Sequence, residues 1–515
     1  MGSEFKLGHR CTVKSSKRIF AREYVEHGIP FWRSKDVIDK ALGVFSSYDL
    51  YISEERFEEI DSKFGSPQKG DLLLSSVGNR AGQPYVIEEE ENFYFKDGNI
   101  LWLSEFNGIN PRFLAYWLKS DFGQNKLSSV MIGSAQKALT IDAIRNLNVK
   151  FPPEYYQVNA VKILLAIDNK IELNQKTNQT LEQMAQALFK SWFVDFDPVF
   201  DNLLASVDFN LENLENRLPD ELKQKAQRRL AALDSLHNAA EIKTSLSALA
   251  HELQAQLPTK EATKAAVQAA ETPVEPNFST NPNILPQQAN THAHFPNEFE
   301  HNEQLGWIPK GWGVGVSGDL VDVRDGTHDS PKKSEKGFPL VTSRHITSGR
   351  LDLSAAYLIS ELDYKKVNER SNVEYGDILL TMIGTVGVPY LVMDEPANYA
   401  IKNVGLFRTS QNLYLKNYLH ILLKTAHMQA YLNARVAGTT QKYLSLKVLR
   451  NIDFLLPSNI VLEKFNSIVN NMLFKEKSNI DQINQLTKLR DTLLPKLISG
   501  ELQIPDVTID EEVVD

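Results

Sequence analysis

The chain has little of what a secreted, membrane-bound or metal-clustered protein needs. Its 515 residues contain a single cysteine, Cys11, which excludes an internal disulfide framework and a cysteine metal cluster and fits a reducing compartment. No stretch reaches the roughly 18 consecutive apolar residues of a membrane helix. The first residues, 1–6, contain no apolar signal region. We therefore expect a cytoplasmic globular protein without a membrane association.

Catalytic motifs are also lacking, although three short strings imitate them. Residues 313–318 have the glycine spacing of a dinucleotide-binding turn, but no clear strand precedes them and no helix-forming run follows. Residues 151–155 resemble the Pro-Pro loop of adenine methyltransferases without the amide or acid that holds the target amino group. Residues 219–223 place both halves of a nuclease-like signature in one expected helix, where carboxylates do not converge on Mg²⁺. We predict no catalytic residue and no metal site in this chain.

What the sequence does contain is an internal duplication, displaced by about 305 residues. The first copy carries Gly133, Gln136, Lys137, Leu139, Arg145, Asn146 and Pro152, and the second carries Gly438, Gln441, Lys442, Leu444, Arg450, Asn451 and Pro457. Upstream, residues 70–74 match 376–380, and the Gly-x-Pro of 28–30 matches that of 337–339. This period is far too long for a solenoid repeat, so it predicts a duplicated pair of domains.

Each copy ends in the pattern of a long helix. Residues 155–192 contain no glycine or proline, and apolar residues recur there in a seven-residue seam that the second copy repeats. Asn174 and Asn479 share one seam position, and a buried asparagine can fix helix alignment. We predict two paired antiparallel helices of on the order of 57 Å; the alternative is two amphipathic helices, each packed on its own domain. The predicted seam, which also serves partner docking, is Leu164, Ile167, Ile171, Asn174, Leu181, Leu188, Trp192, Phe465, Val469, Met472, Asn479, Ile483, Leu486 and Leu493.

The chain therefore divides into six expected segments. They are an α+β domain (1–153), a long helix (154–200), an insert (201–303), a second α+β domain (304–457), a second long helix (458–500) and an acidic tail (501–515). From about residue 211 to residue 270 the insert is rich in Ala, Leu, Gln, Lys and Glu, which is typical of helical hairpins. From 272 to 294 it is dense in Pro, Asn and Thr, which is typical of a flexible linker. Gly500 is a natural helix stop, and we expect the tail after it to be loosely held.

Charge is unevenly distributed along the chain. The formal net charge is −9, but the insert 201–303 carries −7 and the tail 501–515 carries −6, so the duplicated parts carry +4. Mildly basic segments are common in proteins of many kinds. The distribution alone therefore does not predict DNA binding, but it removes the objection that an acidic chain would repel DNA.

Basic and polar side chains gather around the Gly-x-Pro turns and in the loops that the two copies share. Arg and Lys bind phosphates or guanine edges, and Asn and Gln pair with adenine, so these residues are candidates for DNA binding. In the first copy they are Lys14, Lys17, Arg18, Arg22, Arg33, Ser34, Lys35, Asn79, Arg80, Gln83, Gln136 and Lys137. In the second they are His328, Lys332, Lys333, Lys336, Ser343, Arg344, His345, Thr385, Gln441 and Lys442. For any one of them, a solvated surface side chain is the competing interpretation.

The order of these motifs resembles the specificity (S) subunit of Type I restriction–modification enzymes. The segments that carry the resemblance are 28–37, 70–74, 136–139, 167–171, 190–198, 306–312 and 493–501. Together they cover nearly all of the chain except about 201–295. The first domain begins at Phe5 without the Pro-x-Gly-Trp opening of the second, and the family pattern does not explain the Ala-rich insert.

The resemblance implies an α+β protein of two similar target-recognition domains, separated by two long antiparallel coiled-coil helices and related by a pseudo-twofold internal duplication. Each domain would read one half of an asymmetric, interrupted sequence in double-stranded DNA. Two methylation subunits and two restriction subunits would bind the helices, and the chain would not form a homo-oligomer by itself. The chemistry would belong to these partners, which use S-adenosylmethionine, ATP and Mg, and this chain would hold no cofactor.

Two other classes of function remain as alternatives. The acidic insert and tail could mark a scaffold or an anti-restriction DNA mimic, which would have no affinity for DNA. A self-contained enzyme would bind S-adenosylmethionine by itself, and the missing motifs make it the least favoured hypothesis.

Overall fold

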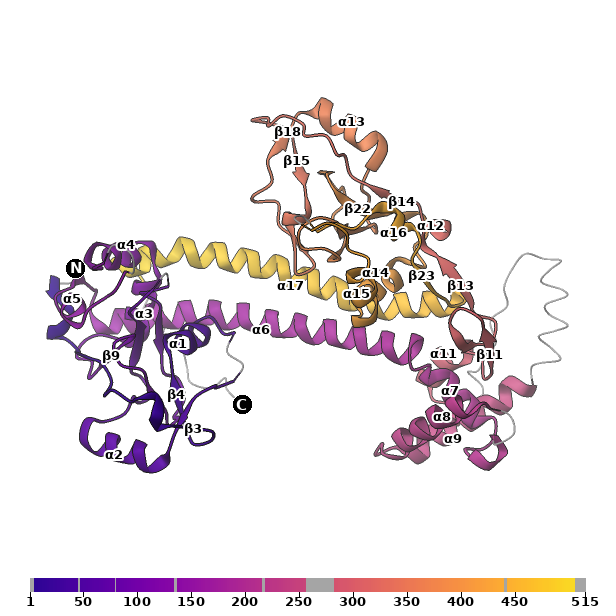
Figure 1. Cartoon of the computed structure of the whole chain (residues 1–515), viewed down its shortest axis with the longest axis horizontal. Coiled ribbons are helices and arrows are strands. Elements are labelled where there is room, and N and C mark those ends of the chain that lie inside the picture. The colour runs from indigo at the N-terminus through magenta and orange to yellow at the C-terminus, as the bar shows by residue number, and fades with distance from the viewer. Residues whose placement is uncertain are drawn as a thin grey trace. The chain divides into compact units, whose positions relative to one another are not determined.

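The chain folds as two compact units that share two long helices. The computed structural model describes residues 4–44, 47–78, 80–133, 137–214, 218–255, 282–439 and 442–504. One unit consists of residues 1–176 with 479–515, and the other consists of residues 177–478. Each contains one α+β domain and a stretch of both α6 (Glu154–Phe193) and α17 (Asn459–Ser499) (Figure 1). Within the described residues, no helix has the length and apolar character needed to cross a bilayer.

The domain of the first unit is built on two four-stranded sheets. One has the order β2 (Thr12–Lys14), β9 (Ile100–Ser104), β6 (Leu72–Ser75), β7 (Pro84–Val86), and the other has the order β3 (Tyr24–Val25), β5 (Tyr51–Ile52), β4 (Ile29–Trp32), β8 (Tyr94–Phe95). A separate pair joins β1 (Glu4–Lys6) to β10 (Asn148–Lys150). The helices are α1 (Ser34–Ala41), α2 (Glu54–Phe64), α3 (Pro111–Lys119), α4 (Asp121–Val130) and α5 (Ile141–Arg145). The apolar strands β6 and β9 are buried along their whole length, and they form the centre of the domain.

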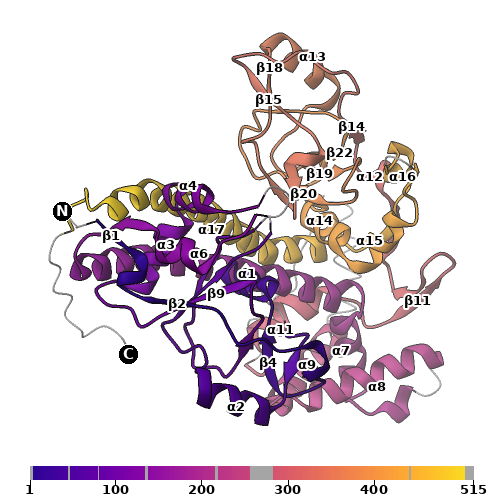
Figure 2. The same cartoon turned by 60° about the vertical axis from the view of Figure 1, so that its left-hand side comes forward.

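The domain of the second unit repeats this plan. Its main sheet has the order β14 (Val323–Asp325), β22 (Val404–Phe407), β19 (Ile378–Thr381), β20 (Pro389–Leu391), and a three-stranded sheet has the order β18 (Leu358–Ile359), β15 (Phe338–Val341), β21 (Ala400–Ile401). Two-stranded pairs join β13 (Gly313–Val316) to β23 (Asp453–Leu456), β16 (Ile346–Thr347) to β17 (Arg350–Leu351), and β11 (Phe299–Asn302) to β12 (Gly306–Pro309). The helices are α12 (Ser317–Leu320), α13 (Glu361–Ser371), α14 (Lys416–Lys424), α15 (Ala426–Asn433) and α16 (Leu446–Arg450). Helix α13 lies beside β15 and β18 (Figure 2). Its Val367 is buried in one apolar cluster with Leu340 and Ile359 of the three-stranded sheet.

The two domains share topology as well as sequence motifs. Strand order β2-β9-β6-β7 corresponds to β14-β22-β19-β20, and in each domain one short strand pairs in parallel, β8 with β4 and β21 with β15. The parallel register places Trp32 opposite Phe95 and Val341 opposite Ile401. The predicted duplicated α+β architecture is therefore confirmed.

The long helices run antiparallel in both units. In the first unit, Asp168 of α6 accepts a hydrogen bond from Arg490 of α17 at 3.1 Å, and Asn174 Nδ2 donates to Gln482 Oε1 at 2.7 Å. In the second unit, Asn178 Nδ2 donates to the Glu476 carbonyl at 3.3 Å, and Phe189 packs edge-on against Phe465 with ring centroids 6.1 Å apart. In both units the contacts move toward lower numbers on α17 as they move toward higher numbers on α6, so the predicted antiparallel pairing is confirmed. Every residue of the predicted seam is buried or half-buried, including Asn174 and Asn479.

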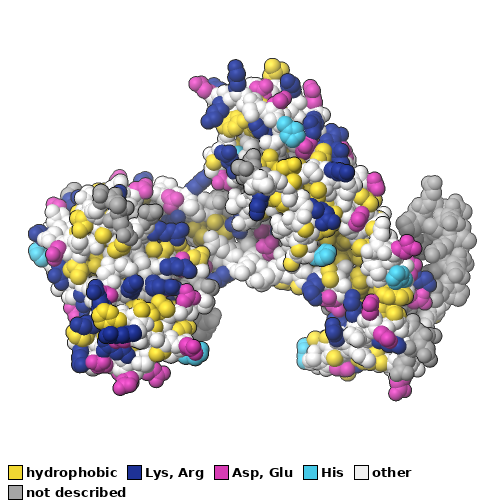
Figure 3. All heavy atoms as spheres, in the orientation of Figure 1, with side chains coloured by type: hydrophobic (Ala, Val, Ile, Leu, Met, Phe, Trp, Pro, Cys, Tyr) yellow, Lys and Arg dark blue, Asp and Glu magenta, His cyan; other side chains and the backbone are white. Residues whose placement is uncertain are grey.

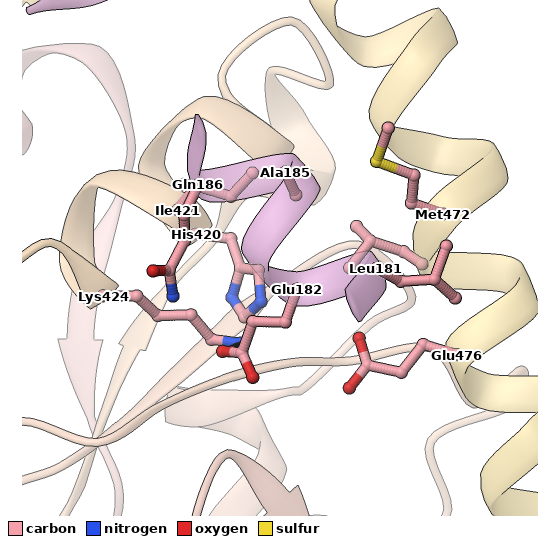
Figure 4. Close-up of a pocket in the computed structure, with 10 residues that line it drawn as sticks. Leu181, Glu182, Ala185, Gln186, His420, Ile421, Lys424, Met472 and Glu476 are labelled. Carbon is pink, nitrogen blue, oxygen red and sulfur yellow. Dashed lines mark hydrogen bonds and ion pairs between the residues drawn. The ribbon is translucent and has the colours of Figure 1, made fainter. Parts of the chain in front are cut away.

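Helix α14 meets the long helices of the second unit around a small cavity of about 10 Å³ (Figure 4). Lys424 Nζ lies 3.0 Å from Glu182 Oε1 there. Burial raises the pKa of Glu476 and lowers the pKa of His420 well below its ordinary value. A cavity of this size holds about one water molecule, so these side chains pack the junction and do not form a ligand site.

Among the described residues, helices of the insert also lie outside the segment 211–270 that the sequence predicts to be helical. Helix α6 ends at Phe193, and the chain continues through α7 (Asp197–Ala205), α8 (Asp220–Asp234), α9 (Ala239–Ala255) and α11 (Pro286–Thr291). The prediction of a flexible linker over 272–294 is wrong for α11 and the 3-10 turn His292–His294. Asn202 Nδ2 donates to the carbonyl oxygens of His292 and Phe295 at 2.7 and 3.0 Å, and this contact holds a Pro- and Asn-rich segment in place. Residues 272–281 lie outside the described part of the chain.

A buried ion pair joins α8 to α7, the helix that follows α6. Arg229 of α8 donates two hydrogen bonds, of 2.7 and 2.8 Å, to the carboxylate of Asp201, which is 2% exposed, and His292 Nε2 lies 3.0 Å from the same carboxylate. Burial by itself raises the pKa of Asp201, but Arg229 and His292 outweigh burial, so this pKa lies below its ordinary value. The ionised carboxylate is therefore stabilised in the folded chain.

The beginning of the acidic tail is not loose. Helix α17 stops at Gly500, which has a φ of +72°, as the sequence predicts. Leu502 and Ile504 then pack on the core of the first unit, and the Leu502 carbonyl accepts a hydrogen bond from the Tyr156 hydroxyl at 2.7 Å. The expectation of a loosely held tail is wrong for residues 502–504, because two apolar side chains find a buried surface there. Residues 505–515 lie outside the described part.

We predict that Arg229→Ala destabilises the second unit by about 3–5 kcal/mol at pH 7, because it leaves Asp201 buried without its partner. The folded-state pKa of Asp201 is depressed, so its contribution is present above the unfolded-state pKa of about 3.9 and is lost as pH falls through the folded-state value. The stability difference between wild type and variant should therefore persist down to about pH 3.9 and shrink at lower pH, as Asp201 takes up a proton. Urea unfolding monitored on both proteins measures it. Arg228→Ala, at an exposed position of α8, is the matched control; an equal loss in both variants would contradict the prediction.

Candidate nucleic-acid interface

The duplicated Gly-x-Pro turn exists because the chain passes close to a neighbouring strand. Gly28 and Gly337 have φ of +150° and +138°. A Cβ atom at these positions would lie 2.3 Å from the carbonyl oxygen of Ile52 and 1.9 Å from that of Ile359. Only glycine fits such a conformation and approach. The motif is therefore structural, and it positions the polar residues that follow β4 and β15.

These polar residues begin with a capped turn in both domains. The Asp36 carboxylate accepts a hydrogen bond from the Arg33 backbone N–H at 2.7 Å, and His345 Nδ1 accepts one from the Thr342 N–H at 2.9 Å. Burial lowers the pKa of His345, which keeps the imidazole neutral and Nδ1 available as an acceptor. A carboxylate and an imidazole thus cap the same turn. Ser34 and Ser343 are the next residues along the chain in the two domains.

The parallel strand brings two further residues to each turn. The Lys96 N–H donates to the Trp32 carbonyl at 2.9 Å, and the Lys402 N–H donates to the Val341 carbonyl at 2.8 Å. Asp97 and Asn403 follow these lysines. Sequence reasoning missed Lys96, Asp97, Lys402 and Asn403, because they belong to no shared motif and only the strand pairing brings them to the turn. The weak parallel between Tyr-Phe-Lys-Asp and Ala-Ile-Lys-Asn was the one available signal.

In the second domain these elements enclose a hollow of about 490 Å³. Ser343, Arg344 and His345, which the sequence predicts as DNA-binding candidates, line it together with Lys402 and Asn403. The other lining residues are Thr342, Ala355, Tyr357, Ile383 and Gly384. Arg344 is exposed, and Lys402 Nζ contacts the Ser330 hydroxyl. The hollow therefore offers two cations, hydroxyls and an amide, which suit phosphate and base edges.

The remaining candidates of the second domain lie on exposed loops near its sheets. His328 Nε2 lies 3.1 Å from Asp325 Oδ2, and His328 Nδ1 lies 2.8 Å from Asn403 Oδ1. Lys333 Nζ lies 5.7 Å from the centre of the Tyr357 ring. The other candidates, Lys332, Lys336, Thr385 and Lys442, are exposed. The backbone N–H of Gly384 donates to the Lys442 carbonyl at 3.2 Å, so the loop that carries Lys442 is tied to the edge of the hollow.

In the first domain several candidate cations already have protein partners. Arg33 donates to Asp36 and to Asp49, at 3.2 and 2.6 Å, and the hydrogen bond from Arg33 lowers the pKa of Asp49. Lys14 Nζ lies 3.6 Å over the Trp102 ring. Arg18 Nε donates to Asp97 Oδ2 at 2.8 Å. Arg33 and Lys14 are thus used in holding the domain together, whereas the Arg18 side chain remains 68% exposed.

The other first-domain candidates surround the same turn and loops. Lys17, Arg22, Lys35, Arg80 and Lys137 are exposed, whereas Gln83 and Ser34 are half-buried. The Gly78 N–H donates to the Lys137 carbonyl at 3.1 Å, which repeats the tie seen at Gly384. Asn79, Gln136 and Gln441 lie outside the described residues. Figure 3 shows Lys and Arg side chains in small groups among acidic and apolar side chains, so no continuous basic surface covers the visible face.

The described part of the chain shows neither a metal-binding cluster nor a reactive thiol. Among the described residues no group of three His, Cys, Asp or Glu side chains is arranged to hold a metal ion. Burial raises the pKa of Cys11 to about 12, which keeps the thiol protonated. The arrangement as a whole presents hydrogen-bonding and cationic groups for binding.

Comparisons with known proteins identify the fold and the family. The model of the Type I restriction modification DNA specificity domain matches residues 3–183 and 309–461. The chain is 25% identical over 451 residues to the HindI specificity subunit of Haemophilus influenzae, covering 84% of this chain and 87% of that protein. It is 24% identical over 498 residues to the MjaIX specificity subunit of Methanocaldococcus jannaschii, covering 94% and 89%. The crystal structure of a Type I S subunit from M. genitalium has the same fold, with a TM-score of 0.52, 13% identity and coverage of 98% and 96%.

We predict that Gly337→Ala disrupts the wall of the hollow, because the added methyl group would overlap the Ile359 carbonyl. The loss of stability should exceed the roughly 1 kcal/mol that a left-handed alanine costs by itself. Gly384→Ala is the matched control, because Gly384 has a φ of +81° and no atom lies within 4 Å of its added Cβ. Thermal unfolding and limited proteolysis within residues 304–457 measure both effects; equal behaviour of the two variants would contradict the structural role of Gly337.

Proposed function

The chain belongs to the family of DNA specificity subunits of Type I restriction–modification systems, and we propose how its two domains divide that task. It is a non-catalytic subunit that binds DNA and recognises the target sequence. In our proposal, each domain reads one half of an asymmetric, interrupted site in double-stranded DNA. The residues after β4 and β8 read one half, and those after β15 and β21 read the other.

The observation that carries this proposal is one scaffold with two sets of side chains. The same strand pairing, the same glycine and the same capped turn occur in both domains. The residues displayed on that scaffold differ: Lys35 of the first domain corresponds to Arg344 of the second, and Asp97 corresponds to Asn403. Two similar domains with different side chains suit a target whose two halves differ in sequence.

Cations around the hollow serve the DNA backbone in this proposal. Phosphate contacts hold a protein in register and supply most of the salt-dependent affinity, whereas base contacts supply specificity. Arg344 and Lys402 line the hollow, and Lys332 and Lys336 are exposed on the loop that precedes β15. We assign these four residues to the backbone of the second half-site.

Partner subunits would complete the reaction. We propose that two methylation and two restriction subunits bind the long helices and bring S-adenosylmethionine, ATP and Mg²⁺, in the cytoplasm. Exposed apolar side chains on these helices support docking there: Tyr155 and Met184 on α6 are 67% and 50% exposed, and Phe474 and Leu489 on α17 are 51% and 47% exposed. No observation favours an anti-restriction DNA mimic, and the cations around the hollow oppose it.

We predict that Arg344→Ala and Lys402→Ala each weaken DNA binding by the complex assembled with methylation subunits, by a similar factor for every sequence. Each should also reduce the slope of log affinity against log salt by about one. Affinities measured from about 50 to 200 mM salt test this, with Lys310→Ala as the control, because Lys310 is paired with Glu298 on the β11–β12 hairpin. Unchanged affinity and slope in both hollow variants would refute the assignment of the hollow to DNA.

A second prediction concerns the gap between the half-sites. Insertion of four helix-forming residues after Lys176 in α6 and after Asp481 in α17 adds about 6 Å to each helix. The recognised half-sites should stay the same, and the gap should lengthen by about one or two base pairs at roughly 3.4 Å per step. Sequencing methylated adenines in cells that carry the assembled system measures the gap. The same insertion in α6 alone should abolish activity by breaking the pairing; an unchanged gap in the double insertion would show that the helices do not set it.

A further inference from the structure

One structural position carries different chemistry in the two domains. In the second domain, His328 Nδ1 lies 2.8 Å from the side-chain amide of Asn403. In the first, Arg18 Nε donates to the carboxylate of Asp97 at 2.8 Å. In the first domain the pair joins the segment after β2 to the segment after β8, and in the second domain it joins the segment after β14 to the segment after β21. We call these two pairs the paired position.

Strand register shows that the pairs correspond. Phe95 and Ile401 face Trp32 and Val341 across the parallel pairing, so Asp97 and Asn403 each stand two residues beyond. In the main sheets, Val13 of β2 pairs with Leu103 of β9, and Val323 of β14 pairs in the same way with Phe407 of β22. Leu103 and Phe407 pair in turn with the equivalent residues of the next strand, Leu72 of β6 and Ile378 of β19. Arg18 and His328 each stand five residues beyond these valines. The paired position is therefore part of the duplicated scaffold, although its residues are not part of any duplicated motif.

The hydrogen bonds around His328 decide how Asn403 is presented. The Asp325 carboxylate, which is 5% exposed, accepts from His328 Nε2 at 3.1 Å. A neutral imidazole with its hydrogen on Nε2 has a lone pair on Nδ1, so Nδ1 accepts a hydrogen bond. The structure places Asn403 Oδ1 at His328 Nδ1, but the two ends of an amide are alike in shape. With Nδ1 as the acceptor, we assign the NH₂ group of Asn403 to this contact. The carbonyl oxygen and the second N–H of Asn403 then remain for a ligand in the hollow that Asn403 lines.

Backbone strain does not account for the pairs. Asn403 has a φ of +52°, and asparagine is one of the few residues that adopt this conformation readily. That requirement alone could explain an asparagine in the second domain. Asp97, however, is not in the left-handed region, and it still engages Arg18. The contact persists where the backbone does not demand it.

We propose that the paired position reads a base in each half-site, with Asn403 recognising adenine and Arg18 recognising guanine; this rests on the proposed reading of DNA by both domains. An amide with one free oxygen and one free N–H matches adenine N6 and N7, and a guanidinium matches guanine O6 and N7. Only Nε of Arg18 donates to Asp97, so the four N–H donors on its terminal nitrogens remain for a base. His328 with Asp325, and Asp97, are the positioning residues.

The test is selection of bound sites from randomised DNA by the complex assembled with methylation subunits. In Asn403→Asp, the side chain keeps its size but loses the NH₂ group, and with it both the hydrogen bond donated to His328 Nδ1 and the donor offered to a base. Preference for adenine at one base pair of one half-site should fall by about 5- to 150-fold, the range of one bidentate contact, and the other positions should not change. Asn433→Asp, at an exposed position of α15, is the matched control.

Two further variants make the outcome decisive. Arg18→Lys should weaken the preference for guanine at one position of the other half-site only, because lysine lacks the paired donors of arginine. His328→Ala should reduce the preference for adenine without unfolding the domain, because the His328 side chain is 66% exposed. An unchanged preference in Asn403→Asp and His328→Ala would overturn this inference while the wild-type selection still shows a bipartite site. Wild-type protein that selects no sequence would instead overturn the proposed function.

Discussion

The antiparallel pairing of α6 with α17 is the constraint on which both units depend. Neither domain has a core that is complete without residues from both helices. In the first unit, Leu164 of α6 and Leu497 of α17 are buried in the same cluster; in the second, Phe189 and Phe465 are. The last turns of α17 thus contribute buried side chains to the core of the domain formed by residues 1–153. Loss of the pairing would expose apolar surface in both domains at once, because apolar burial is the main stabilising contribution.

The sequence predicts the architecture well because each short motif, which is weak evidence by itself, occurs twice in the same order. A Gly-Asp-aliphatic strand or a Gly-x-Pro turn alone is poor evidence, whereas its recurrence in order fixes two domains and two helices. Binding residues are harder to predict. Ser343 and Arg344 follow a recognisable turn, but Lys402 and Asn403 reach it only through the parallel pairing of β15 with β21. Parallel pairing joins segments that are distant in sequence, and nothing in the local composition marks it.

The insert shows where composition misleads. The segment around Pro286 has the residues of a linker, yet Pro286 occupies the first turn of α11, where proline is tolerated. Its position depends on Asn202, which donates to the His292 carbonyl, and on Asp201, whose carboxylate contacts the His292 ring; both residues belong to α7. Propensity describes a segment in isolation and contains no information about such distant partners. The same limit applies to Leu502 and Ile504, whose apolar side chains are held by the first unit.

The capped turns after β4 and β15 have an evolutionary consequence. Asp36 and His345 perform the same capping task through different atoms, and the hydrogen bonds that position the neighbouring lysines come from the main chain. A main-chain frame does not depend on which side chains it displays. Single substitutions can therefore alter what one domain prefers while its partner domain and the frame itself stay as they are, which gives a host lineage a short mutational route to a new specificity.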